Sequence, residues 1–312
     1  MPDQKTDNVV LIAGPTAAGK TALAIELARK IDGEIVNADS MQVYRDLQIL
    51  SARPSAAEMA LVPHHLFGVI DGGETCSAGR WARIAETVIR DITSRGKAAI
   101  VVGGTGLYFR ALEEGLSPVP ETPADVRQQA RAHFDAVGAP AFQQEVVAFD
   151  PELGHLAQGD TQRLLRAWEV HHATGKPLSG FQNAPRRPLI DGVRARVILL
   201  PDREGLYRKC EARVDAMMEA GALEEAAHLR ARGLDPQLPV VKALGAAELI
   251  AHLNGEMDLE TAIDLTKRNT RRFVKRQLTW FRNQTPDWSS AHDTKSSLEI
   301  LTDAMQQGNS NF

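Results

Sequence analysis

Eight residues near the amino end, GPTAAGKT at positions 14–21, constrain the fold more than any other part of this sequence. The apolar run 9–13 before them has the length of a buried strand, and residues 22–28 after them predict a helix. Between a strand and a helix, a glycine-framed loop lets backbone N–H groups converge on an anion, and the helix N-terminus adds positive potential. We therefore expect this segment to bind a diphosphate or a triphosphate.

Each residue of this loop contributes to the predicted phosphate site. Lys20 supplies a mobile positive charge, and the hydroxyl of Thr21 can hold Mg²⁺. The predicted phosphate-binding residues are Gly14, Pro15, Thr16, Ala17, Ala18, Gly19, Lys20 and Thr21. The alternative is a strand–turn–helix junction that contains two glycines and a lysine without binding phosphate.

The first third of the chain alternates between strand-like and helix-like segments. Residues 34–39 and 97–102 predict strands, and residues 81–94 carry apolar side chains at helical spacing. This alternation predicts an α/β core with a parallel sheet of the phosphate-loop NTPase type. Ligands bind such sheets beyond the carboxyl ends of the strands, so the loop, Asp39 and the glycine-rich turn 103–106 are expected to share one crevice.

The alternation stops after residue 117, where a proline-rich stretch begins. Residues 118–189 read as helices without strands, and we predict that they form a helical insertion. The core is predicted to comprise residues 1–117 and 190–284, with a helical C-terminal region. The remainder, 285–312, is predicted to be a polar tail with at most a short helix over 298–305.

Composition limits the class of protein. The two cysteines, Cys76 and Cys210, are far apart and lack metal-ligand spacing, which fits a reducing cytoplasm. No apolar run approaches the ~20 residues that cross a bilayer, so we expect no membrane partner. No long apolar heptad pattern favours assembly, and we expect a monomer. The net charge of −4 argues against a nucleic-acid partner on average, but the charges are unevenly placed.

Asp39 closes the second predicted strand, within the segment DSMQVYR. A carboxylate at that place can act as a general base or hold Mg²⁺ near the phosphates. It can equally be a helix N-cap, because Asp and Ser are favoured caps. The spacing alone leaves these possibilities open.

Two further segments are candidates for ligand binding. The turn GGTG at 103–106 permits close backbone approach and offers the hydroxyl of Thr105, although such turns often only accommodate a positive φ. Residues 267–282 carry seven positive charges and no acid. On a helix, five of them form one stripe: Arg268, Arg271, Arg272, Lys275 and Arg276. An acid-free stripe favours a phosphate backbone as its partner, and the alternative is a basic surface helix. Phe273, Leu278 and Phe281 are expected to face the core.

Six motifs in order carry a resemblance to a known family. They are GPTAAGKT, ADSMQVYR, PHHL, VVGGTGLY, QRLLRAWEVHHATGKPLS and RFVKRQLTWFR. From about residue 9 to residue 282, the chain resembles the bacterial tRNA dimethylallyltransferases. The resemblance implies transfer of a dimethylallyl group from dimethylallyl diphosphate to N6 of adenosine 37, beside the anticodon of tRNA.

The resemblance also implies roles for individual residues. Asp39 would accept the proton of N6, while Lys20, Mg²⁺ on Thr21 and Thr105 would stabilise the departing diphosphate, with Arg213 reaching it. The target adenine would leave the anticodon loop to enter the crevice, and the insertion would grip the anticodon stem-loop. The residues that match tRNA-contacting positions are Asp39, Ser40, Met41, Gln42, Thr105, Arg127, Gln162, Arg163, Leu164, Leu165 and Arg166.

The sequence departs from the family pattern at a few places. Ala18 stands where Ser is common, and the segments 66–68, 156–160 and 245–246 differ at positions expected to contact tRNA. Two rival functions follow from the residues alone. One is a small-molecule kinase, which would use the loop for ATP. The other is an RNA-binding phosphate-loop protein without chemistry of its own.

Overall fold

The computed structural model describes residues 8–190 and 192–309, which form two compact units. One unit contains the chain up to Glu113 and again from Pro188, and the other runs from Glu114 to Arg187. Each unit has its own buried core.

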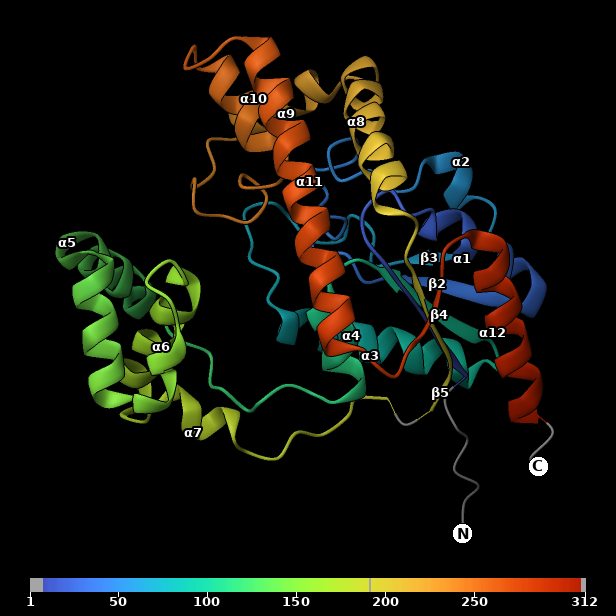
Figure 1. The fold of residues 1–312 in the computed structure, drawn as a ribbon, viewed down its shortest axis with the longest axis horizontal. Helices are drawn as coiled ribbons and strands as arrows, with labels where there is room; N and C mark the ends of the chain where they lie inside the picture. The colour runs from blue at the N-terminus through green and yellow to red at the C-terminus, as the bar shows by residue number, and fades with distance from the viewer. Residues whose placement is uncertain (1–7, 191, 310–312) are drawn as a thin grey trace. The chain divides into compact units, whose positions relative to one another are not determined.

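The first unit is built on an all-parallel sheet, of which Figure 1 labels β2, β3, β4 and β5. The sheet has six strands in the order β3-β2-β4-β1-β5-β6. The strands are β1 (Val9–Ala13), β2 (Gly33–Asn37), β3 (His64–His65), β4 (Ala98–Gly103), β5 (Val193–Leu199) and β6 (Ser289–Ala291). Every residue of β1, β2 and β4 is buried, which agrees with the continuous apolar runs that predicted a sheet covered on both faces. The α/β phosphate-loop fold class is confirmed.

Helices cover both faces of this sheet. Helices α1 (Lys20–Ile31) and α12 (Thr294–Asn309) share a core with β1 and β5 (Figure 1). The opposite face is covered by α3 (Ala78–Ser94) and α4 (Gly106–Glu113). Strands β1 and β4 are neighbours in the sheet, and the helices that follow them, α1 and α4, cover opposite faces. The crevice at the carboxyl ends of these two strands therefore lies at a topological switch point.

The remaining helices of this unit include the long basic segment. It forms α11 (Leu259–Gln284). Asp258 is the N-cap of this helix, and its side chain accepts the N–H of Thr261. The other helices are α2 (Ala56–Met59), α8 (Arg203–Glu219), α9 (Ala222–Ala231) and α10 (Ala246–Leu253).

The regular secondary structure of the second unit consists of helices alone. It contains α5 (Ala124–Phe149), the 3-10 helix η1 (Pro151–His155), α6 (Thr161–Thr174) and α7 (Leu178–Gln182). Helix α5 is kinked where Gly138 adopts a φ of 77° shortly before Pro140. Phe142, Leu164 and Trp168 are among the residues that fill its core.

The segment after residue 285 corrects one prediction. Instead of a polar tail, it forms β6, which pairs with β5, and α12, whose Leu298 and Leu301 are buried in the sheet core. A three-residue polar strand has no periodicity to detect, because its pairing with β5 defines it. Residues 310–312 lie outside the described part of the chain.

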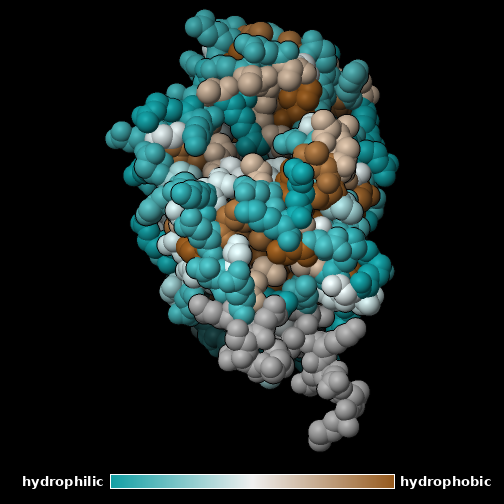
Figure 2. Space-filling model, turned by 90° about the vertical axis from the view of Figure 1, so that its right-hand side faces the viewer, coloured by the Kyte–Doolittle hydropathy of each residue, from teal (hydrophilic) through white to brown (hydrophobic). Residues whose placement is uncertain are grey.

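Across residues 8–190 and 192–309, no helix combines the length and the apolarity needed to traverse a bilayer. On the face shown in Figure 2, hydrophobic side chains are interspersed among hydrophilic ones.

Candidate active site

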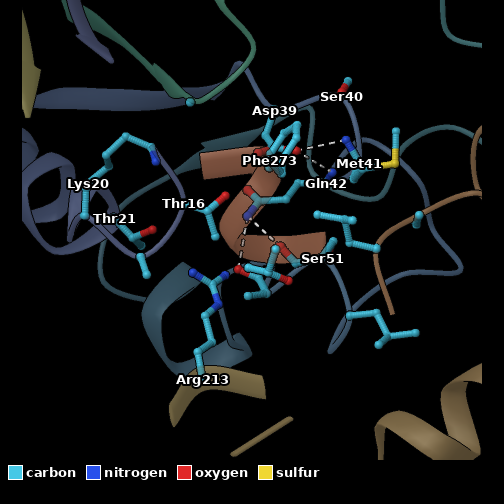
Figure 3. A pocket seen from close by; sticks show the side chains of 18 of the residues that line it. Thr16, Lys20, Thr21, Asp39, Ser40, Met41, Gln42, Ser51, Arg213 and Phe273 are labelled. Carbon is cyan, nitrogen blue, oxygen red and sulfur yellow. Dashed lines mark hydrogen bonds between the residues drawn. The ribbon is translucent and has the colours of Figure 1, made fainter. Parts of the chain in front are cut away.

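A cavity of about 510 Å³ lies beyond the carboxyl ends of the strands of the first unit. Its walls are the phosphate loop, the turn after β2, the loop 50–54, and residues of α8 and α11 (Figure 3). The structure therefore brings the phosphate loop and Asp39 into one crevice, as the sequence predicted.

The phosphate loop presents backbone groups to this cavity. Helix α1 begins at Lys20 after Gly19, whose φ is 95°, and neither a side-chain cap nor an acidic residue occupies its first turn. Its first N–H groups are therefore available to an anion. Thr16, Ala17, Ala18, Gly19, Lys20 and Thr21 all line the cavity.

Gly14 and Pro15 contact other parts of the protein and not the cavity. A Cβ on Gly14 would lie 2.6 Å from the carbonyl oxygen of Leu199 in β5, so a larger residue would push the loop off the sheet. The carbonyl oxygen of Pro15 accepts a hydrogen bond of 2.7 Å from Nζ of Lys20. Neither residue lines the cavity wall.

Four Lys and Arg residues line the cavity, and two of them, Lys20 from α1 and Arg213 from α8, are labelled in Figure 3. Burial lowers the pKa of Lys20 to about 8; Asp39 opposes this shift, whereas Arg213 adds to it. Burial also lowers the pKa of Arg213, again against the attraction of Asp39. Two desolvated cations that repel each other make this pocket suited to an anion carrying more than one charge.

The two carboxylate oxygens of Asp39 have different environments. Oδ1 accepts the backbone N–H groups of Met41 (2.9 Å) and Gln42 (3.4 Å), as Figure 3 shows. Among the described residues, none donates a hydrogen bond to Oδ2. The cap and the general base, which the sequence left as alternatives, are therefore compatible: one oxygen orients the carboxylate and the other is available to a substrate proton.

A buried asparagine holds Asp39 in place. The side chain of Asn37, fully buried at the end of β2, accepts the N–H of Asp39 at 2.9 Å. Its amide nitrogen donates to the carbonyl oxygens of Asp39 and Leu66, each at 3.1 Å. Asn37 was not among the residues predicted from the sequence, although a polar residue at the end of an otherwise apolar strand is a detectable signal.

The glycine-rich turn after β4 packs against the protein's own chain. None of Gly103, Gly104 and Gly106 has a positive φ, so conformational freedom does not explain them. A Cβ on Gly103 would collide with the backbone of Ala38, one on Gly104 with the side chain of Gln277, and one on Gly106 with the ring of Trp280. The glycines permit close approach to neighbouring segments, and Gly103 also lines the cavity, whereas Gly104 and Gly106 do not.

Thr105 lies behind the Asp39 turn and is not part of the cavity wall. Its hydroxyl accepts the N–H of Ser40 at 3.0 Å, and its own N–H donates to the carbonyl of Ala38 at 3.2 Å. Because the hydroxyl oxygen acts as an acceptor here, its proton remains available for donation.

The other residues of the turn line the cavity as predicted: Ser40, Met41 and Gln42. The amide nitrogen of Gln42 donates to the carbonyl oxygens of Ser51 and Ala52, both at 3.0 Å. Part of the Gln42 side chain therefore shapes the loop 50–54, and its amide oxygen is left for a ligand.

The basic side chains of α11 fall into two groups. Arg271 pairs with Glu211 of α8, and Lys267 pairs with Asp215 of the same helix at 2.6 Å. Arg268, Arg272, Lys275 and Arg276 are exposed, and Arg276 also borders the cavity beside Phe273. Phe281 is buried as expected, whereas Phe273 lines the cavity and was wrongly predicted to face the core.

The predicted RNA contacts of the helical unit differ in exposure. Arg127, Gln162 and Arg163 are exposed, and Leu164 is fully buried in the core of that unit with Leu165 packed against it. Arg166 donates to the hydroxyl of Thr122 at 2.9 Å and to the carbonyl of Pro120 at 3.0 Å. The side chain of Leu164 is thus unavailable to a ligand, because it packs inside the unit.

A metal ion would find few protein ligands in this cavity. No cluster of three or more His, Cys, Asp or Glu side chains suited to a metal occurs among the described residues. Thr21 and Asp39 both line the cavity, and a hydroxyl with a carboxylate is the sparse oxygen donor set with which Mg²⁺ binds when substrate phosphates and water complete its shell.

The fold and this cavity define a phosphate-loop α/β enzyme in which a polyanion site faces a carboxylate. Residues 42–284 match the family model of IPP transferase, and residues 7–65 match that of isopentenyl transferase. The chain is 51% identical to the tRNA dimethylallyltransferase of Caulobacter sp. (strain K31), over 92% of this chain and 93% of that protein. It is 50% identical to that of Parvibaculum lavamentivorans, over 94% of both.

Solved structures agree with the sequence relatives. The tRNA isopentenylpyrophosphate transferase of Bacillus halodurans superposes with a TM-score of 0.70 at 33% identity, covering 98% of this chain and 99% of that one. A eukaryotic dimethylallyltransferase acting on tRNA gives a TM-score of 0.78 at 28% identity, covering 97% and 78%. This chain belongs to the tRNA dimethylallyltransferase family.

Proposed function

We propose that this protein transfers the dimethylallyl group of dimethylallyl diphosphate to N6 of adenosine 37 in tRNA. The observation that carries the proposal is the single cavity in which a bare phosphate loop faces Asp39 with one oxygen free. A phosphate loop recognises linked phosphates through backbone groups and does not require a nucleotide. The family relatives support the choice of donor and acceptor.

In the proposed reaction, the loop amides, Lys20 and Arg213 hold the diphosphate. As the allylic C–O bond breaks, negative charge develops on the leaving oxygen, and these fixed positive groups stabilise it without reorganising. Thr105 does not line the cavity, but its hydroxyl proton is not used within the turn, and we propose that it contributes to stabilising the leaving group.

Asp39 is proposed to accept the proton of N6 through Oδ2. The lone pair of this amine is delocalised into the purine, so a fixed carboxylate within ~3 Å assists the attack. The bond from N6 to the allylic carbon forms, the proton passes to Asp39, and diphosphate leaves with the electron pair of the broken C–O bond. The adenine must leave the anticodon loop stack to reach the cavity, which is inexpensive in a single-stranded loop.

Mg²⁺ is proposed to bind through Thr21, with Asp39 nearby. The ion would neutralise part of the charge of the bound diphosphate. This role fits the donor set of the cavity, because the Thr21 hydroxyl and the Asp39 carboxylate both belong to its lining.

The tRNA contacts are proposed to come from both units. In the first unit they include Ser40, Met41 and Gln42 and the exposed cations of α11, chiefly Arg272, Lys275 and Arg276. In the helical unit, residues 114–187, they are Arg127, Gln162, Arg163 and Arg166, which we propose grip the anticodon stem-loop. We further propose that the protein acts as a monomer, because one chain supplies every wall of the cavity. Its substrate implies action in the cytoplasm.

A transfer assay separates this function from the kinase alternative. The protein is incubated with Mg²⁺, unmodified tRNA and dimethylallyl diphosphate labelled in its hydrocarbon part, or with ATP instead. We expect label in the RNA and no consumption of ATP. Label that stays off the RNA while ATP is hydrolysed would support a kinase.

A further inference from the structure

One side chain of α11 joins two segments of the active site that are far apart in the sequence. Gln277 is 5% exposed and lies on the inner face of the helix. Its Oε1 accepts the backbone N–H of Thr16 in the phosphate loop at 3.0 Å. Its Nε2 donates to the carbonyl oxygen of Gly104, after β4, at 2.9 Å. These two partners fix the orientation of the amide, because an N–H can only donate and a carbonyl can only accept.

The neighbouring packing leaves this connection little freedom. A Cβ on Gly104 would collide with Nε2 of Gln277, and one on Gly106 would collide with the ring of Trp280, one turn further along α11. Helix α11 therefore packs directly against the glycine-rich turn. This turn also holds the segment of Asp39 in place, because the hydroxyl of Thr105 accepts the backbone N–H of Ser40.

The chemistry of the link demands an amide of this length. Leucine would fill the space but leave two groups unpaired, the partly buried N–H of Thr16 and the buried carbonyl of Gly104, which is costly. A carboxylate could still accept the N–H of Thr16, but it would repel the carbonyl oxygen of Gly104. Asparagine has the same amide group, but its side chain is one methylene shorter and would not reach both partners.

We propose that Gln277 is a positioning residue that holds the phosphate loop in its diphosphate-binding conformation and at its distance from the Asp39 side of the cavity. It acts through the backbone of Thr16 and Gly104 and touches neither substrate. The proposal rests on the proposed function in one respect, namely that the loop binds the donor diphosphate.

The first test is the affinity of Gln277→Leu for dimethylallyl diphosphate with Mg²⁺ and without tRNA, measured by calorimetry. We expect the Kd to rise about tenfold or more, as for two buried groups left unpaired. The KM for dimethylallyl diphosphate should rise in parallel, while the Kd for tRNA stays within about twofold. The matched control is Thr279→Ala on the exposed face of the same helix, whose hydroxyl bonds only the carbonyl of Lys275 in its own helix.

The second test uses Gln277→Glu, which keeps the shape and can regain the missing donor by protonation. The ratio of its diphosphate Kd to that of the wild type is measured from pH 8 to pH 6. We expect this ratio to fall at least several-fold at the lower pH, because a buried carboxyl has a raised pKa and, once protonated, can donate to Gly104.

The outcomes are distinct. A folded Gln277→Leu variant with wild-type diphosphate affinity would overturn the proposal, and so would a Gln277→Glu ratio independent of pH. If Gln277→Leu fails to fold, the pH series of Gln277→Glu decides. A wild-type protein that does not bind dimethylallyl diphosphate would instead contradict the proposed function.

Discussion

The two sides of the cavity are built in different ways. On the phosphate side, the backbone N–H groups of the loop face the ligand together with the side chains of Lys20 and Arg213, and α1 begins without any side-chain cap. On the Asp39 side, the groups that face the ligand are the side chains of Asp39 and Gln42, and each already makes an internal hydrogen bond: Asp39 to Met41, and Gln42 to Ser51.

This difference determines how each side responds to substitution. A backbone site depends on conformation, so we expect it to tolerate a change of the small side chain at Ala18. A side-chain site depends on the polar atom of each residue that makes no internal hydrogen bond, such as Oδ2 of Asp39. Replacing that atom removes its contact with the substrate, while the internal hydrogen bonds of the residue persist. The predictions below probe this contrast.

The largest effect is expected for Asp39→Asn. The amide oxygen can still accept the N–H groups of Met41 and Gln42, so the turn is retained, but the base is lost. We expect kcat to fall about 10²-fold or more, with tRNA and diphosphate Kd values nearly unchanged. Single-turnover transfer with both substrates saturating measures this.

Asp39→Ala serves as the companion variant, because it also removes the cap. A transfer rate of Asp39→Asn close to the wild-type rate would contradict the role of Asp39 as the base. It would leave only an orienting role for this residue.

The second prediction concerns pH and Lys20. In the free protein its pKa is about 8 because of burial. A bound diphosphate adds negative charge and raises that pKa, so above pH 8 binding must recover a proton that the free protein has lost. The Kd for dimethylallyl diphosphate should therefore rise up to about tenfold per pH unit above pH 8.

Calorimetry across pH 7 to 10 checks this, with Lys20→Met as the control. That variant should bind more weakly at pH 7 and lose the rise above pH 8. A wild-type Kd that stays constant to pH 10 would show that Lys20 does not sense the ligand.

A smaller effect is expected from the cations of α11. Arg272 is exposed, whereas Arg271 is paired with Glu211. Arg272→Ala should weaken tRNA binding several-fold and reduce the slope of log Kd against log salt by about 1. Arg271→Ala should do less, because its charge is already engaged. Filter binding at four salt concentrations compares the two, and equal effects would refute the distinction.

The smallest effect is expected for Ala18→Ser in the phosphate loop. Because the loop works through its backbone, the diphosphate Kd and kcat should change less than about twofold. A larger gain would mean that the side chain at this position takes part in binding.

The parts of the molecule that could be predicted from sequence are those whose residues are contiguous. The phosphate loop, the position of Asp39 at the end of β2, and the buried strands are local patterns, and they were found. The roles of Asn37 and Gln277 escaped because their partners are set by tertiary packing. Thr16 and Gly104 are 261 and 173 residues away from Gln277.

The helical face of α11 shows the same limit. The positions Thr266, Thr270, Val274, Gln277 and Phe281 are all buried. A single amide at the apolar spacing of an otherwise basic helix was the available signal. The role of Gln277 could be inferred only once the structure showed that the phosphate loop and the glycine-rich turn pack against this face of α11.

The most direct test of the account is the identity and place of the product. Purified tRNA is incubated with the protein, Mg²⁺ and dimethylallyl diphosphate, digested with nucleases, and analysed by mass spectrometry, while released diphosphate is quantified. We predict N6-dimethylallyladenosine at position 37, formed in a one-to-one ratio with diphosphate. Unmodified adenosine 37, or a dimethylallyl group on any other atom, would contradict the account.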